Sequence, residues 1–401
     1  MLLMLSLAHA NGLTSHVTIS EWAVPQLPEG ELADILGDPE LWPWLQNGTQ
    51  FPDGGYPLGE AYAETAHWEP FQDLYLHWIA ETYAGDYSSL EARQHIAFLF
   101  GMQSHGMGDQ VFDSLYMQRA YVQDAESDWE GSSMDEATDV ALAAATGGQE
   151  TLDPFVPTDV IVPLMAEAGV EVSASTLESG QLLTAVAITY VREAGKDPAT
   201  LKEYTDAFPW ATTHMMGRET PGAPAWEADV VARYWQSRWG ILTGEPSSLE
   251  PVLFTFPQQG GFGLATDHTA VESRLTVIFS RGLVPEVLVP DLFEVVDAEG
   301  NAYALEDPWV FYGRGSHAVH LAPVEDWPAD TDFILTIHAG AHFIDGTDST
   351  EEVIVKFSSR PPPEVADPDD PAECGCSGSA GGASAGLVVL AAGALLRRRR
   401  R

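Results

Sequence analysis

The sequence predicts a mainly α-helical domain followed by a β-sandwich domain. Two patterns support this prediction. Apolar residues recur at helical spacing through most of residues 11–245, whereas short runs rich in Val, Ile, Phe and Leu, broken by Gly, Asp and Pro, fill residues 250–359. The length of 401 residues also suits two or three domains.

The helical pattern extends over six segments, which are residues 58–84, 88–123, 134–146, 157–168, 174–193 and 225–240. Wide apolar faces in residues 160–170 and 182–191 predict packing against other helices. An irregular crossing is expected at residues 203–224, and Thr14 or Ser15 is expected to cap a further helix.

The β pattern predicts about seven strands, among them residues 274–280, 292–297, 318–321, 333–337 and 352–357. Such a number fits a small β-sandwich. Four motifs resemble bacterial Ig-like domains, namely Phe279-Ser280, Asp297-Ala298-Glu299-Gly300, Leu321-Ala322-Pro323 and Asp345-Gly346. The strand histidines leave open a second metal site, although structural roles are favoured for His317, His320, His338 and His342.

The most informative segment is the helix expected at residues 97–113. It places His105, Asp109 and Asp113 at successive i+4 steps, and hence on one helical face beside an apolar run. Charged groups this close to a core need neutralisation, which a metal ion supplies. The alternative is a polar stripe on an amphipathic helix.

Polar residues upstream add to this candidate metal site. Asp53 lies in a turn-rich loop, His67 lies among aromatic residues, and His16 lies in the first turn of an expected helix. Together they form a nitrogen and oxygen ligand set that suits zinc, comprising His16, Asp53, His67, His105 and Asp109.

Several of these stretches match a known family in order, namely residues 12–17, 51–53 with Tyr56, 65–71, 77–83 and 97–115. The region from residue 12 to about 140 resembles the zinc-dependent phospholipase C family. Within that family it most resembles the N-terminal domain of glycosylphosphatidylinositol-specific phospholipases D. The resemblance implies a phospholipase C/P1 nuclease-like helical domain that holds three zinc ions and hydrolyses phosphate esters.

The resemblance also implies the role of each ligand. One zinc would be surrounded by Asp53, His67, His105 and Asp109. Asp109 would bridge to a second zinc, held also by His16 and by the chain's own amino terminus at Asn11. Asp53 would be the general base, either directly or by orienting water.

The third metal site departs from the family pattern. The family usually has a histidine where Asp113 stands, and the later candidates here are Asp135 and Asp139. A site of three aspartates is harder than a typical zinc site, and it favours Ca²⁺, Mg²⁺ or Mn²⁺ or stays empty. Two zinc sites are therefore expected, together with a third site of altered chemistry.

The charge of the chain limits its partners. The net charge is -42, and five of the 18 basic residues are the terminal arginines. Such a surface repels nucleic acid, which argues against a nuclease, and it disfavours anionic lipid. A zwitterionic phospholipid or a small phosphoester is the expected substrate. The two cysteines, Cys374 and Cys376, both lie in the tail, so no disulfide is expected within a folded domain.

Both ends of the chain predict export. Residues 1–10 form an apolar run ending in Ala-His-Ala, typical of a cleaved signal peptide, and cleavage would leave Asn11 first. Residues 360–373 form a Pro/Asp-rich linker. Residues 374–401 combine a Cys motif, an apolar run and an Arg cluster, and they resemble myxobacterial C-terminal sorting signals. This resemblance implies surface or outer-membrane attachment and a processing protease, and the alternative is a plain transmembrane anchor.

The sequence thus predicts an exported, surface-attached zinc-dependent phospholipase. Whether it would cut as a C-type or a D-type enzyme stays open. The alternative is a non-catalytic cell-surface binding protein that keeps the phospholipase fold but has an altered third metal site.

Overall fold

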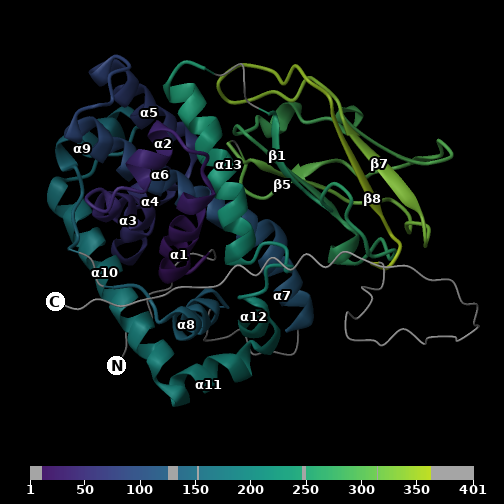
Figure 1. Ribbon diagram of the computed structural model, residues 1–401, viewed down its shortest axis with the longest axis horizontal. Helices are drawn as coiled ribbons and strands as arrows, with labels where there is room; N and C mark the ends of the chain where they lie inside the picture. The colour runs from purple at the N-terminus through teal and green to yellow at the C-terminus, as the bar shows by residue number, and fades with distance from the viewer. Residues whose placement is uncertain (1–10, 125–133, 151–152, 246–249, 314, 363–401) are drawn as a thin grey trace, which may run out of the picture. The chain divides into compact units, whose positions relative to one another are not determined.

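The computed structural model describes residues 11–124, 134–150, 153–245, 250–313 and 315–362 (Figure 1). The expected signal peptide, and the features expected beyond residue 362, lie outside these residues. The described residues up to Pro361 form one compact unit in which helices precede strands. Whether the helical and β parts fold as separate domains stays a prediction.

The helical part contains the elements α1 (Leu13–Ala23), α2 (Glu31–Leu36), α3 (Trp42–Gln50), η2 (Pro52–Leu58), α4 (Tyr62–His67), α5 (Glu69–Tyr83), α6 (Leu90–Val111), η3 (Phe112–Met117), α7 (Gln118–Gln123), α8 (Met134–Thr146), α9 (Thr158–Glu167), α10 (Ala174–Lys196), α11 (Pro198–Ala207), α12 (Pro209–His214) and α13 (Pro224–Leu242), with a short 3-10 turn, η1 (Val24–Gln26). Ser89 begins α6 as its N-cap, because its hydroxyl accepts the Ala92 N–H at 3.1 Å. Ser173 and Asp197 cap α10 and α11 in the same way.

The sequence expectation about the start of α1 is corrected. The N-cap of α1 is Gly12, and Thr14 and Ser15 lie inside the helix, where their N–H groups donate to Asp139 of α8. The cap therefore comes from a distant helix, which no local pattern reveals.

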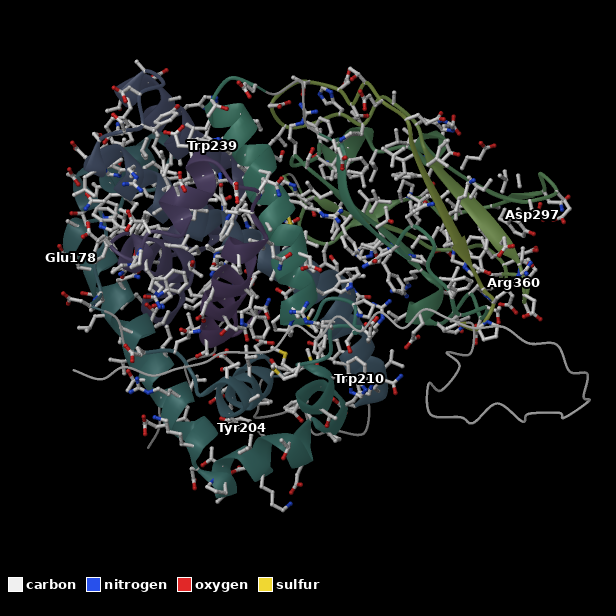
Figure 2. The ribbon with its side chains drawn as sticks, in the orientation of Figure 1. Glu178, Tyr204, Trp210, Trp239, Asp297 and Arg360 are labelled. Atoms are coloured by element: carbon white, nitrogen blue, oxygen red, sulfur yellow. The ribbon has the colours of Figure 1, made fainter. Side chains whose placement is uncertain are left out.

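The crossing expected to be irregular at residues 203–224 instead contains the end of α11 and all of α12, which carry Tyr204 and Trp210 (Figure 2). Pro198 and Pro209 each stand in a first turn, where the missing N–H costs nothing.

The long helices expected at 58–84 and 88–123 both differ from the prediction. The first becomes η2, α4 and α5, with a break at Trp68, which has extended backbone and is the N-cap residue of α5. The second is continuous, but residues 112–117 form a π-helical segment. A π turn is wider than an α turn, and Asp113 lies in the first turn of this segment.

The strands of the described β part form two four-stranded antiparallel sheets. One sheet has the order β1-β2-β6-β5 and the other β4-β3-β7-β8. The strands are β1 (Val252–Phe256), β2 (Leu275–Phe279), β3 (Phe293–Asp297), β4 (Ala302–Tyr303), β5 (Trp309–Val310), β6 (Ala318–Leu321), β7 (Asp332–Ile337) and β8 (Val353–Ser358). Both sheets contribute to one core, with Val277 and Val319 from the first and Val295 and Leu335 from the second. The α-then-β order of the prediction is thus confirmed, while the Ig-like likeness stays an expectation.

The first sheet also buries its opposite face against the helices. Phe254, Ile278 and Ala318 belong to the same hydrophobic cluster as the helical core, and Phe254 packs edge-on against Trp226 of α13, with ring centroids 3.9 Å apart. Helix α13 runs between the other helices and the strands (Figure 1). Helices and strands are therefore joined by a shared apolar interior.

In the part of the chain that the structure describes, no helix is long and apolar enough to cross a membrane. The apolar run predicted as a transmembrane segment lies beyond residue 362, outside the described residues.

Candidate metal centre

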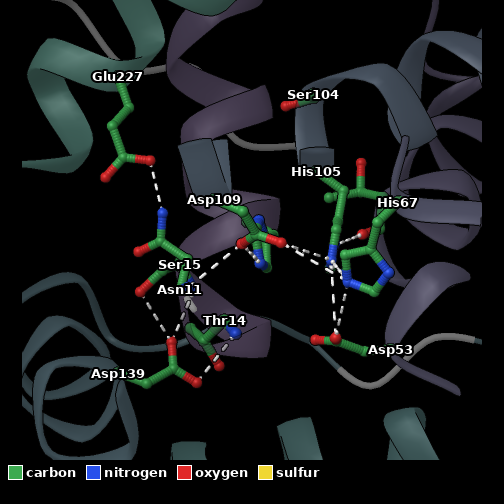
Figure 3. Close-up of polar contacts among 12 residues, drawn as sticks. Asn11, Thr14, Ser15, Asp53, His67, Ser104, His105, Asp109, Asp139 and Glu227 are labelled. Carbon is green, nitrogen blue, oxygen red and sulfur yellow. Dashed lines mark hydrogen bonds and ion pairs between the residues drawn. The ribbon is translucent and has the colours of Figure 1, made fainter. Parts of the chain in front are cut away.

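Five of the predicted ligands converge in the interior of the helical part, and Figure 3 labels four of them, Asp53, His67, His105 and Asp109. They come from four separate elements, which are α1 for His16, η2 for Asp53, the end of α4 for His67, and α6 for His105 and Asp109. All five are buried. Buried imidazoles and carboxylates that face one another need a partner of opposite charge.

Two of these residues, His67 and His105, face each other through their Nε2 atoms. The Nδ1 of His67 lies 2.6 Å from the Ala63 carbonyl, and the Nδ1 of His105 lies 2.7 Å from the Thr49 carbonyl. A carbonyl can only accept, so each Nδ1 carries the proton and each neutral ring leaves its Nε2 as an acceptor. These two Nε2 atoms are 2.9 Å apart. Two acceptors at this distance indicate a cation between them, and backbone carbonyls are frequent orienting partners of metal-bound histidines.

Asp53 and Asp109 complete a four-atom group around this pair. Asp53 Oδ1 lies 3.4 Å from His67 Nε2 and 3.6 Å from His105 Nε2. Asp109 Oδ2 lies 3.6 and 3.4 Å from the same two atoms. Ligand atoms at zinc–ligand distances of about 2.0–2.1 Å in a tetrahedron lie about 3.3 Å apart. The five distances among these atoms are close to this value, so the four side chains could hold one cation between two nitrogen and two oxygen ligands, at a site called site 1 below.

The other oxygen of Asp109 faces a second group, called site 2. Asp109 Oδ1 lies 3.1 Å from His16 Nε2 and 3.3 Å from the backbone nitrogen of Asn11. Neither ring nitrogen of His16 has a hydrogen-bond partner, although both are buried. Asp109 is thus placed to bridge two cations, and His16 stacks on His105 with ring centroids 3.7 Å apart.

The pKa values of the site histidines follow from this crowding. Burial alone would lower the pKa of His67, but the nearby carboxylates of Asp53 and Asp109 outweigh it and raise the pKa. Burial, reinforced by repulsion from His16 and His67, holds the pKa of His105 well below its usual value. His105 is therefore neutral and able to bind a cation at ordinary pH.

A third group consists of three carboxylates, Asp113, Asp135 and Glu227. Burial, together with repulsion from Asp109, Asp135 and Glu227, raises the pKa of Asp113 well above its usual value. Asp113 Oδ1 and Glu227 Oε1 are buried without a hydrogen-bond partner. The group has the all-oxygen character predicted for the third site, although its members do not meet in a compact ligand set like that of site 1.

Asp139, the remaining predicted ligand, has both carboxylate oxygens engaged at the start of α1 (Figure 3). Its Oδ2 accepts the Thr14 N–H at 3.0 Å, and its Oδ1 accepts the Ser15 N–H at 2.6 Å and the Ser15 hydroxyl at 2.9 Å. Burial raises the pKa of Asp139 to about 6 despite these hydrogen bonds. The arrangement is that of a helix cap, and it holds the helix that carries His16.

Glu227 of α13 is a residue of the site that sequence reasoning missed. Its Oε2 accepts the side-chain N–H of Asn11 at 2.5 Å, and burial raises its pKa well above the usual value. The available signal was a single glutamate on an apolar helix face between Ala225 and Ala228. Its proximity to Asn11, 216 residues away, could not be read from the sequence.

Glycines on α6 allow these elements to approach. A Cβ on Gly106 would lie only 2.1 Å from the His67 carbonyl oxygen, and one on Gly101 would lie 2.2 Å from the Leu45 carbonyl oxygen. Helix α6 therefore touches the backbones of α3 and α4 directly, which brings the His67 ring to His105.

Comparisons with known proteins show similarity to phospholipases over part of the chain. No family model matches the chain. It is 31% identical over 121 residues to the phosphatidylinositol-glycan-specific phospholipases D of Rattus norvegicus and Homo sapiens, and 32% identical over 115 residues to that of Mus musculus. These matches cover 26–28% of this chain and only 13–14% of the relatives. Part of the chain is therefore distantly similar to a phospholipase.

Solved structures resemble this chain only weakly. The bacterial S-layer protein SbsC, domains 1–6, gives a TM-score of 0.23 at 11% identity, covering 83% of this chain and 46% of that one. Its N-terminal part gives a TM-score of 0.22 at 9% identity, covering 82% of this chain and 79% of that one. Scores this low do not indicate a common fold.

Proposed function

We propose that this protein is an exported, surface-attached, zinc-dependent phospholipase that hydrolyses a phosphodiester of a phospholipid or a related phosphoester. The observation that carries the proposal is the buried group of Asp53, His67, His105 and Asp109, whose Asp109 also faces His16. The distant similarity to phospholipases D supports the same reaction class. Only zinc of the common ions combines a preference for this nitrogen and oxygen set with the absence of redox chemistry.

The protein's own residues would prepare the reaction. Zinc, when bound, would act as a Lewis acid, lowering the pKa of a water molecule and offsetting charge on the phosphate. Asp53 has the most exposed side chain of the site 1 residues, at 9% against 0–2% for the other three. It is therefore the one best placed to meet water and substrate, and we assign it as the general base.

The residues beside site 1 favour a substrate with an organic headgroup. Tyr56 and Trp68 are half-buried, with ring centroids 5.2 and 5.6 Å from that of His67. Glu64 holds both, accepting the Tyr56 hydroxyl at 3.0 Å and the Trp68 indole N–H at 2.7 Å. Aromatic faces beside a carboxylate suit a cationic or neutral headgroup better than an anionic one.

The alternative function, a non-catalytic surface binding protein, rests on the third group. If Asp113, Asp135 and Glu227 hold no cation, the protein would keep sites 1 and 2 yet lack part of the charge that stabilises a phosphoryl transition state. Metal content alone separates the two functions poorly, because sites 1 and 2 could fill in either case.

Turnover is the deciding measurement. Purified zinc-loaded protein would be assayed with p-nitrophenyl phosphorylcholine and with a panel of phospholipids, and the products identified to tell C-type from D-type cleavage. Hydrolysis that is lost in Asp53→Asn but kept in His95→Phe is the expected result. His95 is a matched control, because it is a buried histidine on α6 bonded to Tyr75, away from site 1. No turnover on any substrate, with zinc bound, would favour the binding protein.

A further inference from the structure

Residues that directly follow two site 1 ligands are held by one short stretch of the β part. Trp68 and Glu69 follow His67, and Gln110 follows Asp109. All three contact residues of the connection between β5 and β6 or the start of β6. A contact that fixes the residue next to a ligand also fixes the backbone from which that ligand projects.

The strongest of these contacts is a buried ion pair between the helices and the β part. His317 Nε2 lies 2.7 Å from Glu69 Oε2, and both side chains are at most 2% exposed. The other nitrogen of His317 donates to the Phe279 carbonyl at 3.0 Å. Glu69 also accepts the Gly282 N–H at 3.0 Å and the Tyr234 hydroxyl at 3.2 Å. The carboxylate of Glu69 is therefore bound from the β part and from α13 at once.

The charges of this network balance without a metal ion. Arg238 of α13 pairs with Asp73 and lies 3.5 Å from Glu69 Oε1. Although burial would raise the pKa of Glu69, Arg238 and His317 lower it to about 2. The two carboxylates, Glu69 and Asp73, thus face two basic side chains, Arg238 and His317. In sites 1 and 2, by contrast, no arginine or lysine of the described residues pairs with the carboxylate oxygens that face the imidazoles. The network therefore needs no cation of its own, and its residue Glu69 lies two positions after the ligand His67.

Gln110 makes the second connection. Its side-chain oxygen accepts the His317 backbone N–H at 2.6 Å and the Ser316 hydroxyl at 3.4 Å, and Gln110 is buried. Because Gln110 directly follows Asp109 on α6, these bonds fix the helix at the residue that bridges sites 1 and 2.

The same stretch packs closely on the start of α5. The Tyr312 ring lies 4.4 Å from that of Trp68. Gly315 has φ of 90°, and a Cβ at this position would lie 3.2 Å from Cδ of Pro70. The β part therefore contacts residues 68–70, immediately after the ligand His67.

We infer that His317 is a positioning residue for the metal centre. By binding Glu69 through its ring and Gln110 through its backbone, it sets the spacing between the chain segments that carry His67 and Asp109. This inference rests on the proposed metal centre, and it goes beyond the proposed function by giving the β part a role in metal binding. Metal sites need ligands held to within about 0.5 Å, and loss of a residue outside the ligand shell typically costs 10–100-fold in metal affinity.

The test measures metal binding rather than activity. Zinc affinity of the full-length protein would be measured by competition with a chromogenic chelator, and ligand geometry by the visible absorption of the cobalt-substituted protein. We expect His317→Ala to weaken zinc binding about tenfold and to alter the cobalt spectrum. His317→Gln, whose amide can still donate to Glu69, should recover part of both.

His320→Ala is the matched control. His320 is a buried histidine too, three residues further along in β6, but its hydrogen-bond partner is Thr276 and its stacking partner is Trp309, both within the β part. Its truncation should lower stability without changing zinc affinity or the cobalt spectrum. If His317→Ala does not fold, Gln110→Leu tests the same connection from the helical side and should weaken zinc binding in the same direction.

Three results would overturn the inference. Wild-type zinc affinity and cobalt spectrum in the folded variants at His317 and Gln110 would exclude a positioning role. Equal losses in His320→Ala would show only a general effect of stability. A wild-type protein that binds neither zinc nor cobalt would overturn the proposed function and this inference together. Normal zinc binding by both the wild type and His317→Ala would overturn this inference and leave the proposed function standing.

Discussion

At the scale of single residues, protonation decides what site 1 can do. The Nδ1 atoms of His67 and His105 face backbone carbonyls, so in the neutral rings the Nε2 lone pairs face each other, 2.9 Å apart. Asp109 divides its two oxygens between His105 on one side and His16 on the other. The arrangement is costly without a cation, which is why these side chains point to a metal.

The first prediction concerns these ligands. His105→Ala and Asp109→Ala should each remove zinc from site 1, and Asp109→Ala should also remove it from site 2, because Asp109 faces both. Elemental analysis of the purified variants, with His95→Phe as control, measures the effect. Wild-type zinc content in Asp109→Ala would mean that Asp109 is not a ligand.

A second prediction concerns His320, which is distant in sequence from every proposed ligand. Burial, reinforced by Arg274 and Arg119, lowers its pKa to about 3 from 6.5. A depressed pKa means that the folded state favours the neutral ring, so its contribution to stability is full above pH 6.5 and is lost as pH falls toward 3. The loss is about 1.4 kcal/mol per pH unit in this window.

Replacing His320 with Phe keeps a ring on Trp309 and removes the titration. Between pH 6.5 and 5.0, the free energy of unfolding of the metal-free variant should fall by about 2 kcal/mol less than that of wild type. Urea unfolding in the presence of a chelator measures this difference. Parallel pH profiles for the two proteins would contradict the assigned cause.

At the scale of helices and strands, the ligands depend on how element ends are held. Helix α1 has no side-chain cap of its own, and Asp139 of α8 supplies one. Helix α6 carries glycines where it touches α3 and α4, and it passes into a π segment just beyond Asp109. Each feature sets the position of a ligand-bearing backbone.

The third prediction tests Asp139 as a cap. Asp139→Ala should destabilise the metal-free protein by about 1–2 kcal/mol, and Asp139→Asn by less, because the amide oxygen still accepts. Both variants should keep zinc at site 1. The readouts are denaturant unfolding with chelator and zinc content without it. If Asp139→Asn is as stable as wild type but loses an equivalent of metal, Asp139 is a ligand, as the family resemblance implies.

At the scale of the whole molecule, segments far apart in the sequence form one centre. Asn11 reaches Asp109 and Glu227, and the β part reaches the residues after His67 and Asp109. The backbone nitrogen of Asn11 lies 3.3 Å from Asp109 Oδ1, beside His16. A free amino group at that position would be a ligand, whereas an amide nitrogen is a poor one.

The fourth prediction follows from this position. A protein that begins at Asn11 should bind zinc at site 2 more tightly than one with a Met-Ala extension, because an α-amino group has a pKa of about 8 and can lose its proton to a metal. The two preparations would be compared at equal zinc by metal content and turnover. Equal values would remove the amino terminus from the ligand set.

The sequence by itself determined the order of helices and strands, the charge that argues against nucleic acid, and the five residues that form sites 1 and 2. It could do so because helical periodicity is local, and because His105 and Asp109 lie one turn apart on a single helix. It did not reveal Glu227, the capping role of Asp139, or the contacts of His317 with Glu69 and Gln110. Only the tertiary structure decided these, because each is a contact between residues more than one hundred positions apart, chosen by packing rather than by neighbouring sequence.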